Sequence, residues 1–127
     1  MSRTISLLRA RHAVALSSLL VVAACTTTPP AGGALVAGQE ASIEGSVLSV
    51  DTAPWAYDGN AVVTVSTTTS GAVKVQLPAR WNLCKAQPHM GVQELKPRDR
   101  VHAVGTAAEG NSLVVCAQPA HLLRKLD

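Results

Sequence analysis

The chain has 127 residues, of which 47% are hydrophobic and 15% charged, and its formal net charge is +3. This length accommodates one small domain with a tether and leaves no room for two domains. The three surplus positive charges are Arg3, Arg9 and Arg11, so the rest of the chain has eight Lys and Arg against eight Asp and Glu, and such a neutral domain lacks the broad positive surface of nucleic-acid binding proteins.

Residues 1–24 have the pattern of an export signal. A basic start precedes an uncharged run from Ala13 to Ala24, rich in Leu and Val. A membrane-spanning helix needs about 20 apolar residues, and this run is too short and is followed at once by Thr, Pro and Gly. We therefore expect a cleaved signal peptide, the alternative being an N-terminal anchor helix that stays in place.

The end of this run reads Val22-Ala23-Ala24-Cys25, which resembles the lipobox of bacterial lipoproteins. The resemblance implies that Val22, Ala23 and Ala24 are read by a signal peptidase and that the Cys25 thiol is lipidated. Burial contributes about 0.8 kcal/mol per methylene, so two or three acyl chains, such as palmitate, anchor a protein stably. Thr26 follows in place of the aspartate that retains enteric lipoproteins at the inner membrane. We expect attachment to the outer membrane, facing the periplasm.

A tether is expected between the lipid and the folded domain. Residues Thr26 to Gly38 are uncharged and rich in Thr, Pro, Gly and Ala, a composition typical of irregular linkers. The predicted organisation is a signal peptide over 1–24, the lipidated cysteine and flexible tether over 25–40, and one small β-barrel domain over 41–127.

From Ala41 onward, apolar residues recur with period two between turn signals, which favours short antiparallel strands. The alternation breaks at Val47-Leu48, close to Gly45, and this slip predicts a β-bulge. The tail over 121–126 is expected to form one helical turn, the alternative being a last strand. The predicted strands cover residues 42–50, 61–66, 72–77, 100–107 and 112–117.

The segment from Ala79 to Glu94 has no clean period and contains Pro88 and Gly91 as breakers, so we expect at most one short helix there. Once Cys25 is lipidated, Cys84 and Cys116 remain, and an exported compartment allows them to pair. The predicted disulfide closes a loop of about 33 residues and stabilises the fold by roughly 3 to 4 kcal/mol. The alternative is two buried free thiols.

Five strands, the first long and bulged, with an irregular crossover between the third and fourth, resemble the OB-fold over residues 41–126. The fold class predicted is all-β, a small five-stranded OB-like barrel, with an SH3-like barrel or a short β-sandwich left open. The chain lacks Phe and has only three aromatic residues, two Trp and one Tyr. The core must therefore consist of Val, Leu and Ala, which suit a narrow barrel.

The loop between the first two predicted strands is the richest in recognition residues. It places Trp55 and Tyr57 between the carboxylates Asp51 and Asp58. Trp and Tyr give large contact areas and dominate binding hot spots, so these four residues, joined by Trp81, form the candidate binding site. The alternative is that a Trp ring plugs one end of the barrel and that Asp58-Gly59 is merely a turn.

Catalytic and metal sites are not expected. Cys84, His89, Met90 and His102 supply ligand types for copper or zinc, but their spacing resembles no known site, so no metal and no other cofactor are predicted. No nucleophile elbow, metalloprotease helix or phosphate loop occurs in the chain. The predicted function is therefore non-catalytic.

The sequence predicts an envelope lipoprotein that is held to the membrane through acyl chains on Cys25 and binds an envelope protein or a small ligand, with no nucleic-acid partner. One alternative is a structural accessory subunit of an envelope or secretion assembly. Another is a small-molecule or metal sensor.

Overall fold

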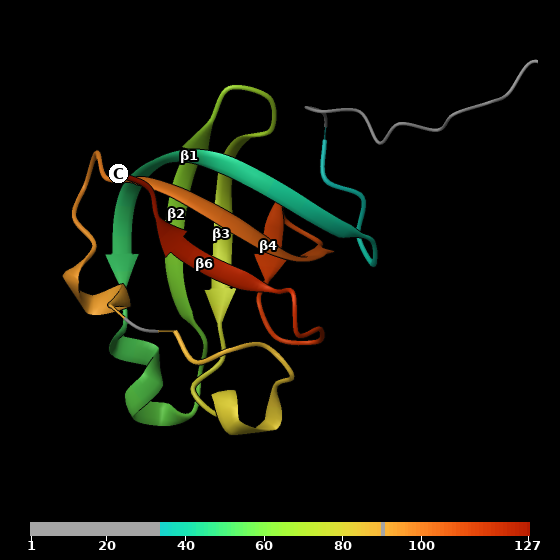
Figure 1. The fold of residues 1–127 in the computed structure, drawn as a ribbon, viewed down its shortest axis with the longest axis vertical. Coiled ribbons are helices and arrows are strands. Elements are labelled where there is room, and N and C mark those ends of the chain that lie inside the picture. Colours follow the sequence, from blue (N-terminus) through green and yellow to red (C-terminus); the bar gives the residue numbers. More distant parts are fainter. Residues whose placement is uncertain (1–33, 90) are drawn as a thin grey trace, which may run out of the picture.

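A computed structural model gives the fold of this protein and describes residues 34–89 and 91–127 (Figure 1). The predicted lipobox, with Val22, Ala23, Ala24 and Cys25, and most of the predicted tether lie outside these residues. In the described part, regular structure consists of strands and three short 3₁₀ helices. None of its helices has the length and hydropathy needed to cross a bilayer.

The first five of the six strands lie within or around the alternating segments of the sequence. Val is the commonest residue in the strands, as expected for a residue whose branched side chain packs well on a pleated surface. The strands are β1 (Glu40–Asp51), β2 (Ala61–Thr67), β3 (Gly71–Leu77), β4 (Arg100–Ala108), β5 (Ser112–Val114) and β6 (Leu122–Lys125), and the 3₁₀ helices are η1 (Ala53–Tyr57), η2 (Trp81–Leu83) and η3 (Val92–Glu94).

Five strands close into a barrel in the order β1-β2-β3-β5-β4, with β4 also pairing with β1. The β3–β5 pair is parallel and the other pairs are antiparallel. The predicted fold class, a mainly β chain with a small five-stranded barrel, is confirmed, and the strand order is consistent with an OB-like fold. In Figure 1 the long β1 curves across β2, β3 and β4.

The barrel interior is filled by aliphatic side chains from every strand of the barrel. Since these residues alternate with exposed ones along β2, β3 and β4, the period-two pattern of the sequence marks the core face directly. The largest apolar side chains that are essentially inaccessible to solvent are Val47, Val63, Val65, Val73, Val75, Leu77, Val101, Leu113 and Val115.

The predicted bulge in β1 is confirmed, because the β1–β2 register shifts between Val47 and Ser49. At this point β1 leaves β4, and Val47 hydrogen-bonds instead to the turn that precedes β4. Its N–H donates to Asp99 O and its carbonyl accepts from Arg98 N, both at 2.8 Å. The bulge thus lets one strand pair with β4 along its first half and with β2 along its second.

Close strand packing explains Gly105 in β4. A methyl group at this position would lie 2.5 Å from the carbonyl oxygen of Val114 and 3.1 Å from Leu113 Cγ. No side chain fits there without displacing β5, so glycine is required by the approach of two backbones.

The prediction of a helical turn over 121–126 is wrong. Residues Leu122–Lys125 form β6, which pairs with β4 from Val101 to Val104. β5 and β6 pair with the same side of β4, one after the other along the strand. Residues 115–121 form the loop between β5 and β6. The hydrophobic period of this tail does not distinguish a strand from a helix, because Leu122 and Leu123 are adjacent. Pairing with the backbone of β4 makes the tail a strand.

The chain joins the barrel before the predicted boundary at Ala41. Gly38 N donates to Ala107 O, and Ala107 N donates to Gln39 O, both at 2.7 Å. Leu35 packs against the core. Residues 35–40 therefore belong to the folded unit and not to the tether.

Candidate functional site

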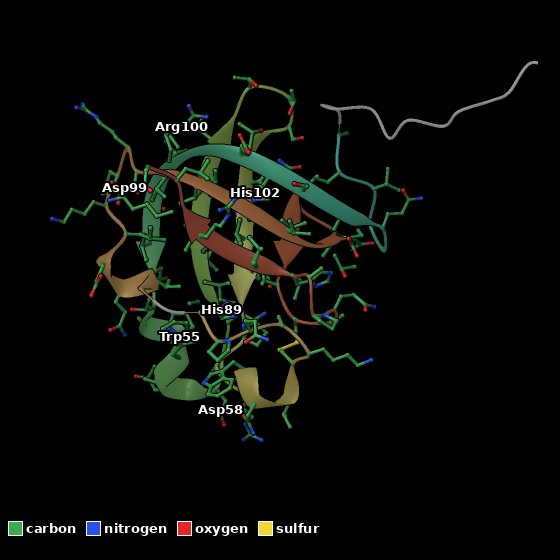
Figure 2. All side chains as sticks on the ribbon, in the orientation of Figure 1. Trp55, Asp58, His89, Asp99, Arg100 and His102 are labelled. Atoms are coloured by element: carbon green, nitrogen blue, oxygen red, sulfur yellow. A yellow bond between two sulfur atoms is a disulfide. The ribbon has the colours of Figure 1, made fainter. Side chains whose placement is uncertain are left out.

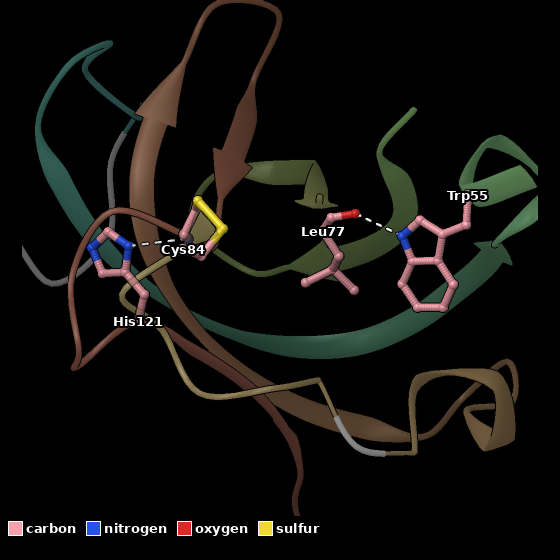
Figure 3. The surroundings of a disulfide bond; sticks show 5 residues. Trp55, Leu77, Cys84 and His121 are labelled. Atoms are coloured by element: carbon pink, nitrogen blue, oxygen red, sulfur yellow. Dashed lines mark hydrogen bonds between the residues drawn. A yellow bond between two sulfur atoms is a disulfide. The ribbon is translucent and has the colours of Figure 1, made fainter. Parts of the chain in front are cut away.

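The connection between β3 and β4 is anchored by the predicted disulfide, which is confirmed. Cys84 and Cys116 are joined across a sequence separation of 32, with an S–S distance of 2.03 Å. The Cys116 carbonyl also accepts hydrogen bonds from Lys85 N at 2.9 Å and Ala86 N at 3.0 Å. Figure 3 shows this junction, with the buried His121 ring beside it and its Nδ1 3.4 Å from Cys116 N.

The predicted binding loop between β1 and β2 folds into η1. The Asp51 carboxylate accepts a hydrogen bond from Ala53 N at 3.0 Å, an Asx-turn contact that starts the helix. The Trp55 indole packs against the core, and its Nε1 donates to Leu77 O at 2.9 Å (Figure 3). Both side chains have structural contacts, and their part in binding stays a prediction.

Tyr57 and Asp58, by contrast, face solvent. Tyr57 is 87% exposed. Asp58 adopts a left-handed conformation, with φ of 59°, and its Oδ2 lies 2.8 Å from Arg80 Nη2. An exposed pair of this kind contributes about 0 to 1 kcal/mol, so its main effect is to hold the end of η1 beside the start of η2.

Two further apolar side chains are exposed on η2. Trp81 is 49% exposed and Leu83 is 74% exposed. In Figure 1, the green η1 and the yellow η2 lie together at the lower end of the barrel, the end opposite the β2–β3 turn. We call the surface formed by Tyr57, Asp58, Arg80, Trp81 and Leu83 the η1–η2 pole.

The structure thus brings three of the five predicted binding residues, Tyr57, Asp58 and Trp81, to one surface. Sequence reasoning missed Arg80 and Leu83, although both flank Trp81 within a segment that has no strand or helix period. An arginine next to an aromatic residue in an irregular segment was the available signal.

A shallow pocket of about 320 Å³ lies between the end of η1 and the β3–β4 connection. Trp55, His89 and Glu94 are among the residues that line it, and Figure 2 labels the neighbouring Trp55 and His89. Both imidazole nitrogens of His89 are shielded from solvent and have no hydrogen-bond partner among the described residues. Burial lowers the pKa of His89 below 6.5, since desolvation disfavours the charged imidazolium.

The other candidate metal ligands are dispersed. Cys84 is in the disulfide, and His102 on β4 lies 2.8 Å through its Nε2 from Ser42 Oγ on β1. Met90 is outside the described residues. Within residues 34–89 and 91–127, no three His, Cys, Asp or Glu side chains gather in an arrangement that could hold a metal ion.

The outer face of β2 and β3 is small and polar. Thr64 lies opposite Lys74 in the β2–β3 register, and Asn60 Nδ2 donates to Gln76 Oε1 at 2.9 Å. The side chains on this face are Val62, Thr64, Ser66, Ala72, Lys74 and Gln76, a set without the stacking aromatics that single-stranded nucleic acids require.

No protein-family model and no curated protein matches the chain. Among solved structures, the chain is similar to OBody NL8 bound to hen egg-white lysozyme, at 24% sequence identity and with a TM-score of 0.49. The similarity covers 72% of this chain and 98% of the OBody. No conclusion about function follows from this likeness.

Proposed function

We propose that this protein is a lipid-anchored binding module of the bacterial cell envelope. The observation that carries the proposal is the lipobox-like Val22-Ala23-Ala24-Cys25 at the end of a basic and then apolar segment. The Cys84–Cys116 disulfide supports it, because such bonds persist in exported proteins and are rare in the cytosol. The proposed location is the outer membrane, with the domain facing the periplasm.

In this proposal the η1–η2 pole contacts a protein partner. Tyr57, Trp81 and Leu83 expose apolar surface around the Asp58–Arg80 pair. Exposed aromatic residues with an arginine are the composition of interface hot spots. The lipid anchor attaches through the segment that precedes β1, so in this proposal the barrel supports the pole and does not act as a catalyst.

The anchor is tested by mass spectrometry of the protein purified from its native membrane. We expect a chain that begins at an acylated Cys25, and a Cys25→Ala variant that no longer fractionates with membranes. A purified chain that retains residues 1–24, or that carries no fatty acid, would refute the envelope assignment.

The binding surface is tested by photocrosslinking in cells. A photoreactive amino acid in place of Tyr57 should yield a discrete crosslinked protein, whereas the same residue in place of Thr68, in the exposed turn at the other end of the barrel, should not. Equal crosslinking from both positions would exclude the pole as the contact surface. If the partner is an assembly, the protein should also co-purify with it in mild detergent, which is the outcome expected for an accessory subunit.

A second candidate function is small-ligand binding in the pocket beside His89. His89 and Trp55, which both line this pocket, support it, since ligand pockets combine apolar walls with a few polar groups. A compound that raises the melting temperature of the native protein but not of a His89→Gln variant would establish this function. A compound that stabilises both variants equally binds elsewhere.

A further inference from the structure

Among the residues that the structure describes, β6 is an edge strand, with β4 on one side and no strand on the other. In the sheet order it stands last and pairs with β4 alone. β3 pairs with β5 from Lys74 to Gln76 and ends at Leu77, so it does not extend far enough to lie beside β6. After Leu77 the chain turns away into η2 and the connection to β4.

The ladder fixes which backbone groups of β6 face this open side. Leu126 N donates to Arg100 O at 2.8 Å, and antiparallel ladders alternate between residues that bond to the partner and residues that point away from it. Arg124 therefore bonds toward β4, like Leu126. The N–H and C=O groups of Leu123 and Lys125 point outward, and no hydrogen bond joins them to the described residues on that side.

A groove runs along these outward groups. It has a volume of about 500 Å³ and lies between β6 and the segment that contains η3. Val92 and Leu123 are buried in its floor, Leu95 is half-buried, and Glu94, Lys96 and Lys125 line its rim. Some domains bind extended peptides at a strand edge beside an apolar groove. The backbone hydrogen bonds to the edge give affinity, and the side chains that enter the groove give specificity.

The charges around the edge favour an acidic occupant. Lys125 is within 3.4 Å of Asp99. Three other charged side chains border the edge, the cations Lys96 and Arg124 and the anion Glu94, and none of them makes an ion pair within 4.0 Å among the described residues. The two cations outnumber the single carboxylate. A second copy of β6 fits poorly. If two copies of β6 paired antiparallel through Leu123 and Lys125, Arg124 of one copy would lie opposite Arg124 of the other. Like charges directly opposite each other are destabilising.

We propose that the free edge of β6 binds an extended acidic segment of a partner protein, which pairs with Leu123 and Lys125 as an additional strand. Alternate side chains of that segment enter the groove over Val92 and Leu95, and carboxylates on the other face meet Arg124. The surface shares no residue with the η1–η2 pole and does not depend on the lipid anchor, so each can be tested without the other.

The probe is a short synthetic peptide of alternating valine and glutamate, added to the ¹⁵N-labelled full chain. We expect the amide exchange of Leu123 and Lys125 to slow by about tenfold or more as their N–H groups acquire partners. A peptide N-methylated at alternate residues keeps the charges but cannot hydrogen-bond, and it should give no protection. The matching valine-lysine peptide should not bind.

Lys125→Pro and Lys125→Ala form the decisive pair of variants. Both remove the ammonium group, but only proline removes the outward N–H, and proline is tolerated on an edge strand when that N–H faces solvent. Binding to Lys125→Pro should be weaker than to Lys125→Ala by about fivefold, the loss typical of one hydrogen bond. Arg124→Glu should weaken binding further while leaving the melting temperature close to that of the native chain.

Three results would overturn the proposal. The first is equal affinity of Lys125→Pro and Lys125→Ala for the valine-glutamate peptide. The second is that the peptide changes the amide exchange only of residues away from β6. The third is that the free chain sediments as a dimer in which Leu123 and Lys125 are protected from exchange. Amide protection by the N-methylated peptide would show that charge alone holds the peptide, and it too would exclude strand addition.

Discussion

The barrel strands and the connection between β3 and β4 are stabilised by different means. The strands bury a continuous set of Val, Leu and Ala side chains. Of the described residues in the connection from Pro78 to Asp99, only Ala86 and Val92 are buried hydrophobic residues. A disulfide and two backbone hydrogen bonds to Cys116 hold the connection in place. The candidate peptide groove and the candidate ligand pocket both border the connection. Both candidate sites therefore lie where core packing is weakest.

The largest effect is expected in the strands. Leu77→Ala removes a fully buried side chain at the end of β3 and should lower the free energy of unfolding by about 2 to 5 kcal/mol, because the cavity adds to the lost transfer energy. Urea denaturation measures this change. The control is Leu83→Ala in the connection, where the side chain is 74% exposed and the expected change is below about 0.5 kcal/mol.

Removing the disulfide tests how separate the two regions are. A Cys84→Ala, Cys116→Ala double variant should lose about 2 to 4 kcal/mol, and hydrogen exchange should accelerate most over residues 78–99. Since core strands open only with the whole domain, β1 and β2 should lose protection only by this global loss of stability, and residues 78–99 should lose more. Equal loss of protection in strands and connection would mean that the two regions unfold as one unit.

Trp55 links the β1–β2 loop to the end of β3. Trp55→Phe keeps a ring in the core but removes the donor to Leu77 O, and it should cost about 1 kcal/mol, the net contribution of one hydrogen bond. Thermal unfolding monitored by circular dichroism is the measurement. No change in melting temperature would show that water replaces the indole N–H at the Leu77 carbonyl.

The smallest expected effect is a pH dependence from His89. Burial lowers the pKa of this imidazole below its ordinary value of 6.5, so the unfolded chain binds its proton first as the pH falls. The contribution of neutral His89 to stability is therefore complete above pH 6.5 and decreases as the pH falls through the range between 6.5 and the lowered pKa. A His89→Gln variant, compared by urea denaturation at pH 7.5 and at mildly acidic pH, should lose less stability than the native chain. An identical loss would assign the dependence to other groups.

Periodicity predicts the strands well because burial of one face dictates it. Val73, Val75 and Leu77 alternate with polar residues, and β3 lies where this pattern places it. The slip at Val47-Leu48 even predicts the bulge. In contrast, β6 could not be predicted, because its four residues form a strand only beside β4, whose position depends on the closure of the whole barrel.

The candidate site was predictable only by residue type. The sequence marks Trp55 and Tyr57 equally, yet the structure directs one ring into the core and the other into solvent. Residues two apart in a 3₁₀ helix point in different directions. The five residues of η1 are too few to show a hydrophobic period, so the sequence does not reveal which side of η1 faces the barrel. The pairing of Asp58 with Arg80 depends equally on tertiary structure.

The pairing of β1 with β4 has a consequence for how the chain folds. β1, β2 and β3 are consecutive, but residues Glu40–Ser46 of β1 pair with Arg100–Thr106, which lie far along the chain. Until β4 docks, the first half of β1 is an unpaired edge, and such edges promote association between chains. Barrel closure is a long-range step with a high entropic barrier, so the folding chain is most exposed to aggregation before β4 reaches β1.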